Sequence, residues 1–128
     1  MRSKLFITLT VLAFFSLMTL APAQEVFGNI SGTVNDSSGA AVANAKVTVT
    51  NTTTGTVVRT LTTNADGSYT APSLPIGKYS VTAEAAGFSK TIVNNIELNV
   101  NEKLNISPTL KVGSAGEVMT VEAEPLQV

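Results

Sequence analysis

The chain of 128 residues contains no cysteine, no histidine and no tryptophan. Without cysteine there are no disulfides and no thiolate nucleophile, and without histidine there is no imidazole for acid–base catalysis. Most transition-metal sites are excluded by the same absences. Carboxylates, hydroxyls and amines remain, but no motif arranges them as a catalytic site. We therefore expect a protein that is not an enzyme and that has no cofactor.

Basic residues are also few, and they do not cluster. After the first 23 residues they are spread singly along the chain, at Lys46, Arg59, Lys78, Lys90, Lys103 and Lys111. Nucleic-acid binding needs a clustered basic face, because its affinity comes from displacing phosphate counterions. The sequence therefore predicts no nucleic-acid partner.

Residues 1–23 have the three parts of a secretory signal peptide. Arg2 and Lys4 form a positive start, an apolar run follows from residue 5 to residue 20, and Ala21-Pro22-Ala23 is a small-residue cleavage site. The apolar run is shorter than the roughly 20 residues that a membrane span needs. We expect cleavage before Gln24, export to the periplasm or to the cell surface and outer membrane, and no membrane span in the mature chain.

Residues 24–112 are rich in threonine and valine and show short runs of alternating polarity. In the clearest run, Tyr79, Val81 and Ala83 are expected to face the core from a central strand. Pro72 and Pro75 cannot donate to a ladder, so the segment from Pro72 to Gly77 is expected to be an edge or a loop. Asp66-Gly67 predicts a hairpin turn. Seven or eight such strands predict an all-β, antiparallel β-sandwich.

The pattern changes after Val112. Gly113 to Gly116 reads as a flexible linker, and residues 117–123 are typical of a strand but have no partner left in the chain. We expect residues 113–128 to lie outside the sandwich.

The sequence resembles the carboxypeptidase regulatory-like domains, also described as transthyretin-like or prealbumin-like sandwiches and grouped with carbohydrate-binding folds. The resemblance covers about residues 28–111 and is carried by Ile30–Val34 with Gly39, Ala45–Val49, Asp66–Tyr69, Leu74–Val81 and Gly87–Phe88. It implies an accessory or binding module. Such domains occur beside peptidases, in surface proteins and at the N-termini of TonB-dependent outer-membrane receptors.

The tail agrees with the last of these settings. Glu117, Val118, Met119, Thr120 and Val121 resemble a TonB box, the extended segment through which a TonB-type energy transducer captures a receptor; Glu122 departs from the usual pattern. Such a segment binds by adding a strand to a sheet edge. The receptor would be a truncated one, because the transmembrane part of such receptors needs many further strands.

An alternative is a free-standing secreted module for carbohydrate binding or adhesion. It would use the loops at residues 35–41 and 72–77, or an aromatic platform built from Phe27, Tyr69, Tyr79 and Phe88, although aromatic residues at alternating positions more often fill a core. A calcium ion between Asp36 and Asp66 is a further alternative to simple turn stabilisation by these side chains.

Overall fold

The computed structural model describes residues 2–4, 26–114, 116–123 and 126–127. The apolar run and the cleavage site of the predicted signal peptide lie outside these residues. Among the described residues, no helix is long and apolar enough to cross a membrane.

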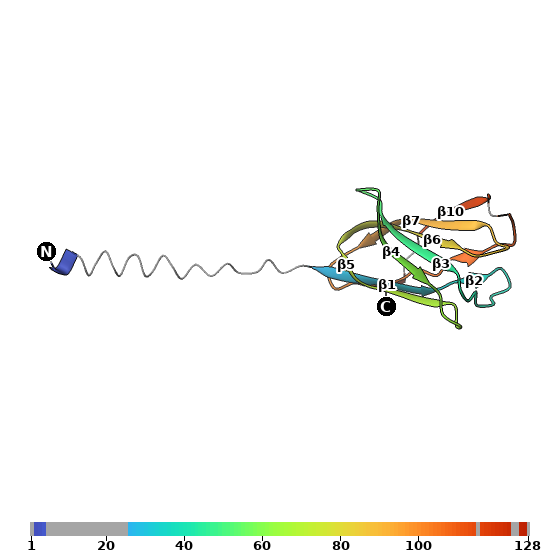
Figure 1. Cartoon of the computed structure of the whole chain (residues 1–128), viewed down its shortest axis with the longest axis horizontal. Helices are drawn as coiled ribbons and strands as arrows, with labels where there is room; N and C mark the ends of the chain where they lie inside the picture. Colours follow the sequence, from blue (N-terminus) through green and yellow to red (C-terminus); the bar gives the residue numbers. More distant parts are fainter. Residues whose placement is uncertain (1, 5–25, 115, 124–125, 128) are drawn as a thin grey trace.

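Two sheets pack face to face (Figure 1). The four-stranded sheet has the order β11-β8-β1-β5, with β1 at Phe27–Thr33, β5 at Ser68–Pro75, β8 at Lys103–Asn105 and β11 at Leu126–Gln127. The five-stranded sheet has the order β10-β7-β6-β3-β4, with β3 at Lys46–Asn51, β4 at Thr56–Thr62, β6 at Gly77–Glu84, β7 at Lys90–Leu98 and β10 at Val118–Glu122. A short ladder joins β2 (Asn35–Asp36) to β9 (Thr109–Leu110). The predicted all-β sandwich is confirmed.

Most strand pairs are antiparallel, and three are parallel. The parallel pairs are β1 with β8, β7 with β10, and β2 with β9. Each parallel pair joins an earlier strand to one of β8, β9 and β10, which follow β7 in the chain and run in the same direction as their partners. Including the two-residue ladders, the described residues form eleven strands, more than the seven or eight expected.

The core lies between the sheets and follows the predicted alternation. Tyr79, Val81 and Ala83 are fully buried on β6, which lies between β7 and β3 and is therefore the central strand that the sequence predicts. Val47 and Val49 face them from β3 and are also fully buried.

The two prolines lie on an edge strand, as expected. β5 ends the four-stranded sheet, and its pairing with β1 shifts register opposite Asn29. At this bulge Ser73 has a φ of 54°, and its N–H donates to Oδ1 of Asn29 at 2.9 Å. Pro72 is accommodated because a bulge at a sheet edge needs no ladder donor there.

The turn at Asp66-Gly67 exists, but it does not close a hairpin. It connects β4 of one sheet to β5 of the other, so the expectation of a hairpin was wrong. Thr63, buried just before the turn, explains the crossing: its hydroxyl donates to the Val42 carbonyl at 2.7 Å and accepts from the Ala45 N–H at 2.8 Å. These bonds satisfy buried backbone groups where the chain leaves its sheet.

Gly32 and Tyr69 are opposite each other in the β1–β5 register. A Cβ on Gly32 would lie 1.8 Å from the carbonyl oxygen of Ile106, so glycine is required for this close approach. The buried Tyr69 hydroxyl donates to the same oxygen. Burial raises the pKa of Tyr69 well above its usual range. This contact fixes the chain after β8 against the four-stranded sheet.

Candidate functional site

The C-terminal segment has a partner inside the chain, which corrects the expectation that residues 117–123 have none. Val118–Glu122 forms β10 and pairs in parallel with Lys90–Asn94 of β7. Pairing completes one end of the five-stranded sheet. The sequence did not reveal this partner because alternation along a strand says nothing about which other strand lies beside it.

Hydrogen bonds from backbone and side chains hold both ends of β10. At its start, the Lys90 N–H donates to the Glu117 carbonyl at 2.9 Å, and the Ser89 hydroxyl donates to Oε2 of Glu117 at 3.0 Å. At its end, the Ala123 N–H donates to the Asn94 carbonyl at 3.0 Å. The Glu117 carboxylate is therefore held at Ser89, directly before β7.

Asn95 completes the second of these contacts. Its side-chain amide donates to the Glu122 carboxylate. Asn95 has a φ of 56° and lies where the β6–β7 register shifts. A bulge re-aims a side chain, and here the re-aimed amide meets β10. Neither Ser89 nor Asn95 carried a signal in the sequence, because each contact depends on the parallel register.

The five residues of the predicted TonB-box-like segment lie together and remain accessible: Glu117 directly precedes β10, and the other four are on it. Glu117, Val118, Thr120 and Val121 are exposed, and Met119 is half-buried. Val118 retains 55% and Val121 48% of their exposure, although both are apolar. The segment is therefore accessible along most of its length.

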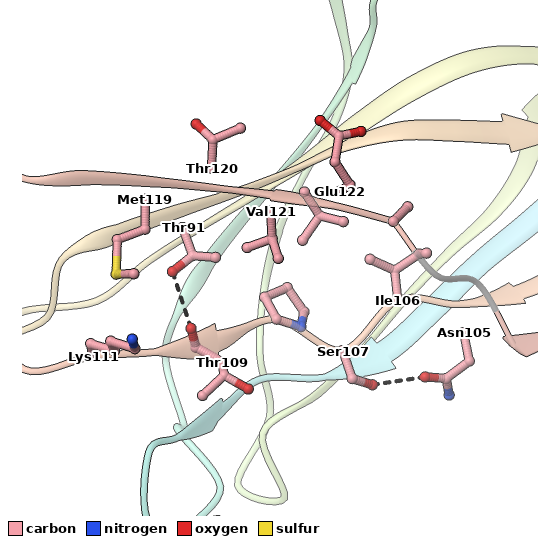
Figure 2. Close-up of a pocket in the computed structure, with 13 residues that line it drawn as sticks. Thr91, Asn105, Ile106, Ser107, Thr109, Lys111, Met119, Thr120, Val121 and Glu122 are labelled. Carbon is pink, nitrogen blue, oxygen red and sulfur yellow. Dashed lines mark hydrogen bonds between the residues drawn. The ribbon is translucent and has the colours of Figure 1, made fainter.

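A groove of about 390 Å³ runs beneath β10 (Figure 2). Its two walls are β10 with the facing part of β7, and the chain from Asn105 to Lys111. Met119 and Val121 project into it from above, and Ile106, the residue after β8, faces them from the other wall.

The aromatic platform proposed for sugar binding does not form. Tyr69 and Tyr79 retain 4% and 0% of their exposure, and their hydroxyls donate to backbone carbonyls. Phe88 is half-buried against the core, and Phe27 is half-buried at the start of β1. Tyr69, Tyr79 and Phe88 therefore contribute to the core of the sandwich.

The two loops predicted as an alternative binding surface are not brought together. Asn35 and Asp36 follow the last residue of β1, whereas Pro75 pairs with its first residue, Phe27. The loops therefore lie toward opposite ends of the sandwich.

Of the two candidate calcium ligands, Asp36 has a structural role in its own turn. Oδ1 of Asp36 accepts hydrogen bonds from the Ser38 N–H, the Ser38 hydroxyl and the Ala40 N–H at 2.6–3.0 Å. The Ser38 hydroxyl is the main reason that the pKa of Asp36 is lowered. The turn before β5 is held by Asn64 instead of Asp66. In the described part of the chain, no cluster of three acidic side chains could hold a metal ion.

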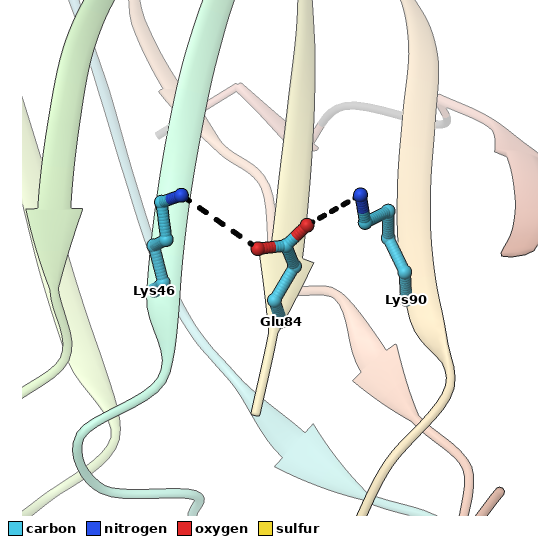
Figure 3. A network of polar contacts seen from close by, with 3 residues as sticks. All are labelled: Lys46, Glu84 and Lys90. Carbon is cyan, nitrogen blue, oxygen red and sulfur yellow. Dashed lines mark ion pairs between the residues drawn. The ribbon is translucent and has the colours of Figure 1, made fainter. Parts of the chain in front are cut away.

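A charge network crosses the five-stranded sheet on its outer surface (Figure 3). Glu84 of β6 lies between Lys90 of β7, at 2.5 Å, and Lys46 of β3, at 3.8 Å. The hydrogen bond from Lys90 is the main cause of the lowered pKa of Glu84. The network joins three neighbouring strands, but one carboxylate between two amines has no geometry for catalysis. Its role is structural.

Comparison with known proteins places the fold in a family. The family model described as "Carboxypeptidase regulatory-like domain" matches residues 29–111. No curated protein sequence matched the chain.

Several solved structures are similar in fold. The Bacillus anthracis TIE protein aligns with a TM-score of 0.59 at 24% identity, over 68% of this chain and 17% of its own. A catechol 1,2-dioxygenase from Acinetobacter sp. ADP1 aligns with a TM-score of 0.54 at 13% identity, over 80% and 60%. The minor pilin of Streptococcus agalactiae aligns with a TM-score of 0.55 at 11% identity, over 73% and 48%.

The chain spans less than two thirds of the length of each of these proteins. At these identities the likeness shows the shared sandwich alone, and the dioxygenase likeness gives no support for an enzymatic activity. The match of the family model over most of the sandwich is more informative. On that match, the chain belongs to the carboxypeptidase regulatory-like domain family.

Proposed function

We propose that this protein is an exported, non-catalytic accessory domain that forms the N-terminal periplasmic module of a TonB-dependent outer-membrane receptor. In this proposal Glu117–Val121 is the segment that a TonB-type energy transducer captures. The observation that carries it is the position of this segment: the five residues that resemble a TonB box form or adjoin the outermost strand of the larger sheet.

Three features of the segment support capture by strand addition. It is already extended, so little backbone entropy is lost when a second strand pairs with it. Its side chains are largely exposed, including those of Val118 and Val121. It is acidic, since residues 112–128 contain three glutamates and no basic residue.

The alternative of a carbohydrate-binding or adhesion module has weaker support. Tyr69 and Tyr79, which would have supplied flat rings for a sugar, are in the core. A glycan array that gives specific binding, abolished by substitutions in residues 35–41, would favour this alternative over ours.

The direct test is calorimetry with the periplasmic domain of a TonB protein. We expect the full chain to bind and Val118→Pro to bind at least about tenfold more weakly, because proline removes a strand donor. Val100→Pro is the matched control, since Val100 is exposed to a similar extent and lies in a turn outside the strands. If a peptide of residues 116–125 does not bind, and Val118→Pro changes nothing in the full chain, the proposal is wrong.

A further inference from the structure

The outer edge of β10 is the open end of the five-stranded sheet. The Glu117 carbonyl and the Ala123 N–H both form hydrogen bonds with backbone groups of β7. In a parallel ladder, alternate residues bond to the same neighbour, so residues 117, 119, 121 and 123 point their backbone groups toward β7. The N–H and C=O groups of Val118, Thr120 and Glu122 then point away from it. No other strand in the described part of the chain pairs along this edge.

The groove lies beneath β10, the strand that carries this open edge. A strand added beside β10 would alternate its side chains between the groove and the outer surface of the sheet. Those that point inward would lie next to Met119 and Val121 and would meet Ile106 and Pro108 of the other wall. The groove volume of about 390 Å³ is within the range of sites that bind small groups, roughly 300–1,000 Å³. Apolar side chains suit it.

Charge identifies the kind of strand that fits. Thr120 and Glu122 point to the outer surface, opposite the groove (Figure 2). Lys111 lies at the far end of the groove from Glu122. A second copy of β10 would bring glutamates and no basic residue to this edge, so it would offer no complementary charge. A strand with lysine or arginine on its outer face is complementary.

We infer that the open edge of β10 and the groove beneath it form one docking site for an extended, basic segment of a partner protein. The segment places alternate apolar side chains in the groove and its basic side chains beside Thr120 and Glu122. This inference rests on the proposed function for the identity of the partner, and it adds how that partner binds: β10 stays on β7, and residues 106–108, between β8 and β9, take part.

The opposite mode is that a partner pulls β10 off β7 and pairs with it elsewhere. An engineered disulfide distinguishes the two modes. Because the chain has no native cysteine, the two introduced cysteines have no other partner within the chain. Thr120 is in register with Ile92, and both are in strands on the outer surface. The variant Thr120→Cys with Ile92→Cys, oxidised, keeps β10 on β7. The same protein after reduction is its matched control.

The first probe is an eight-residue peptide of alternating valine and lysine with blocked ends, and its control replaces each lysine with glutamate. We expect the lysine peptide to bind the oxidised and reduced chains within about twofold, and the glutamate peptide to bind at least about tenfold more weakly. Met119 reports on the groove: its ε-methyl NMR signal, assigned with Met119→Leu, is expected to shift on saturation.

Four results would overturn the inference. The first two are failure of the lysine peptide to bind at all and loss of its binding on oxidation. The other two are equal binding of the two peptides and binding that leaves the Met119 signal unmoved.

The second probe, the TonB periplasmic domain, separates this inference from the proposed function. If the peptide behaves as expected and the TonB domain does not bind, the docking site stands and the proposed partner is wrong. If the TonB domain binds the reduced chain and not the oxidised one, the partner is right and the docking mode is wrong.

Discussion

Replacing Tyr69 with phenylalanine removes one buried hydrogen bond and leaves the ring in place. The hydroxyl is the donor for the Ile106 carbonyl in the core, beside Gly32. Without it, a buried carbonyl loses its partner, and such losses cost about 1–3 kcal/mol. Taking about 2 kcal/mol, the melting temperature should fall by roughly 8–16 °C for a domain of this size.

The same variant makes a prediction about alkaline pH. Burial raises the pKa of Tyr69 above its usual range, whereas in the unfolded chain it titrates near about 10. Above that value the unfolded chain has lost a proton that the folded chain keeps, so the free energy of unfolding falls as pH rises. One such group lowers it by about 1.4 kcal/mol per pH unit, or by about 2 kcal/mol at pH 11.5.

Tyr69→Phe has no hydroxyl at this position to titrate. The difference in free energy of unfolding between the wild type and this variant should therefore shrink as pH rises from 8, and it should be nearly zero at pH 11.5. Urea unfolding followed by far-ultraviolet circular dichroism at pH 8, 10 and 11.5 measures this, because the chain has no tryptophan to follow by fluorescence. Tyr79→Phe is the control. The hydroxyl of Tyr79 donates to the carbonyl of Pro75, which is an exposed residue where water can replace the lost donor, so this variant should lose less stability at pH 8. A deficit that stays constant from pH 8 to 11.5 would refute the reasoning.

Three further predictions follow from the structure. Gly32→Ala should prevent folding or lower the free energy of unfolding by more than about 4 kcal/mol, because the new methyl group would overlap the backbone of Ile106; circular dichroism that shows a wild-type melting curve would contradict this. Glu84→Gln should cost less than about 1 kcal/mol at pH 7, since the pair with Lys90 is partly exposed and screened. That difference should vanish as pH falls below about 4, because a lowered pKa stabilises the fold only while the carboxylate is ionised. Expressed in a bacterium, the chain should be recovered outside the cytoplasm with Gln24 as its first residue by mass spectrometry, and recovery of the intact 128 residues from the cytoplasm would contradict the signal-peptide prediction.

Core residues could be predicted from the sequence where the alternation of apolar and polar residues along one strand shows which side chains are buried. The alternation around Tyr79 and Val81 requires only that side chains point to opposite faces in turn, and both residues are fully buried as predicted. The same holds for the edge position of Pro72, because a missing N–H is a local property. These predictions needed no knowledge of neighbouring strands.

The partner of the C-terminal strand could not be predicted, because parallel pairing joins segments without a short turn between them. Gly113 illustrates the difficulty. In the sequence it belongs to a run typical of a flexible linker, whereas in the structure a Cβ there would lie 2.0 Å from Oγ of Ser89. The glycine allows the chain to pass close to β7 and return beside it. The sequence alone does not distinguish a glycine needed for close packing from a glycine in a flexible linker.

The family signature and the candidate site are physically connected through Ile106. The Asp66–Tyr69 motif places Tyr69 on β5, and Gly32 opposite it on β1 leaves room for the Ile106 carbonyl. The Tyr69 hydroxyl holds that carbonyl from inside the core, while the Ile106 side chain lines the groove under β10. The residues by which the family is recognised therefore set the position of one groove wall, and the tail beyond the family match supplies the other. A docking site built this way needs both parts of the chain, so changes in the tail can alter which partner is bound while the sandwich beneath it is unchanged.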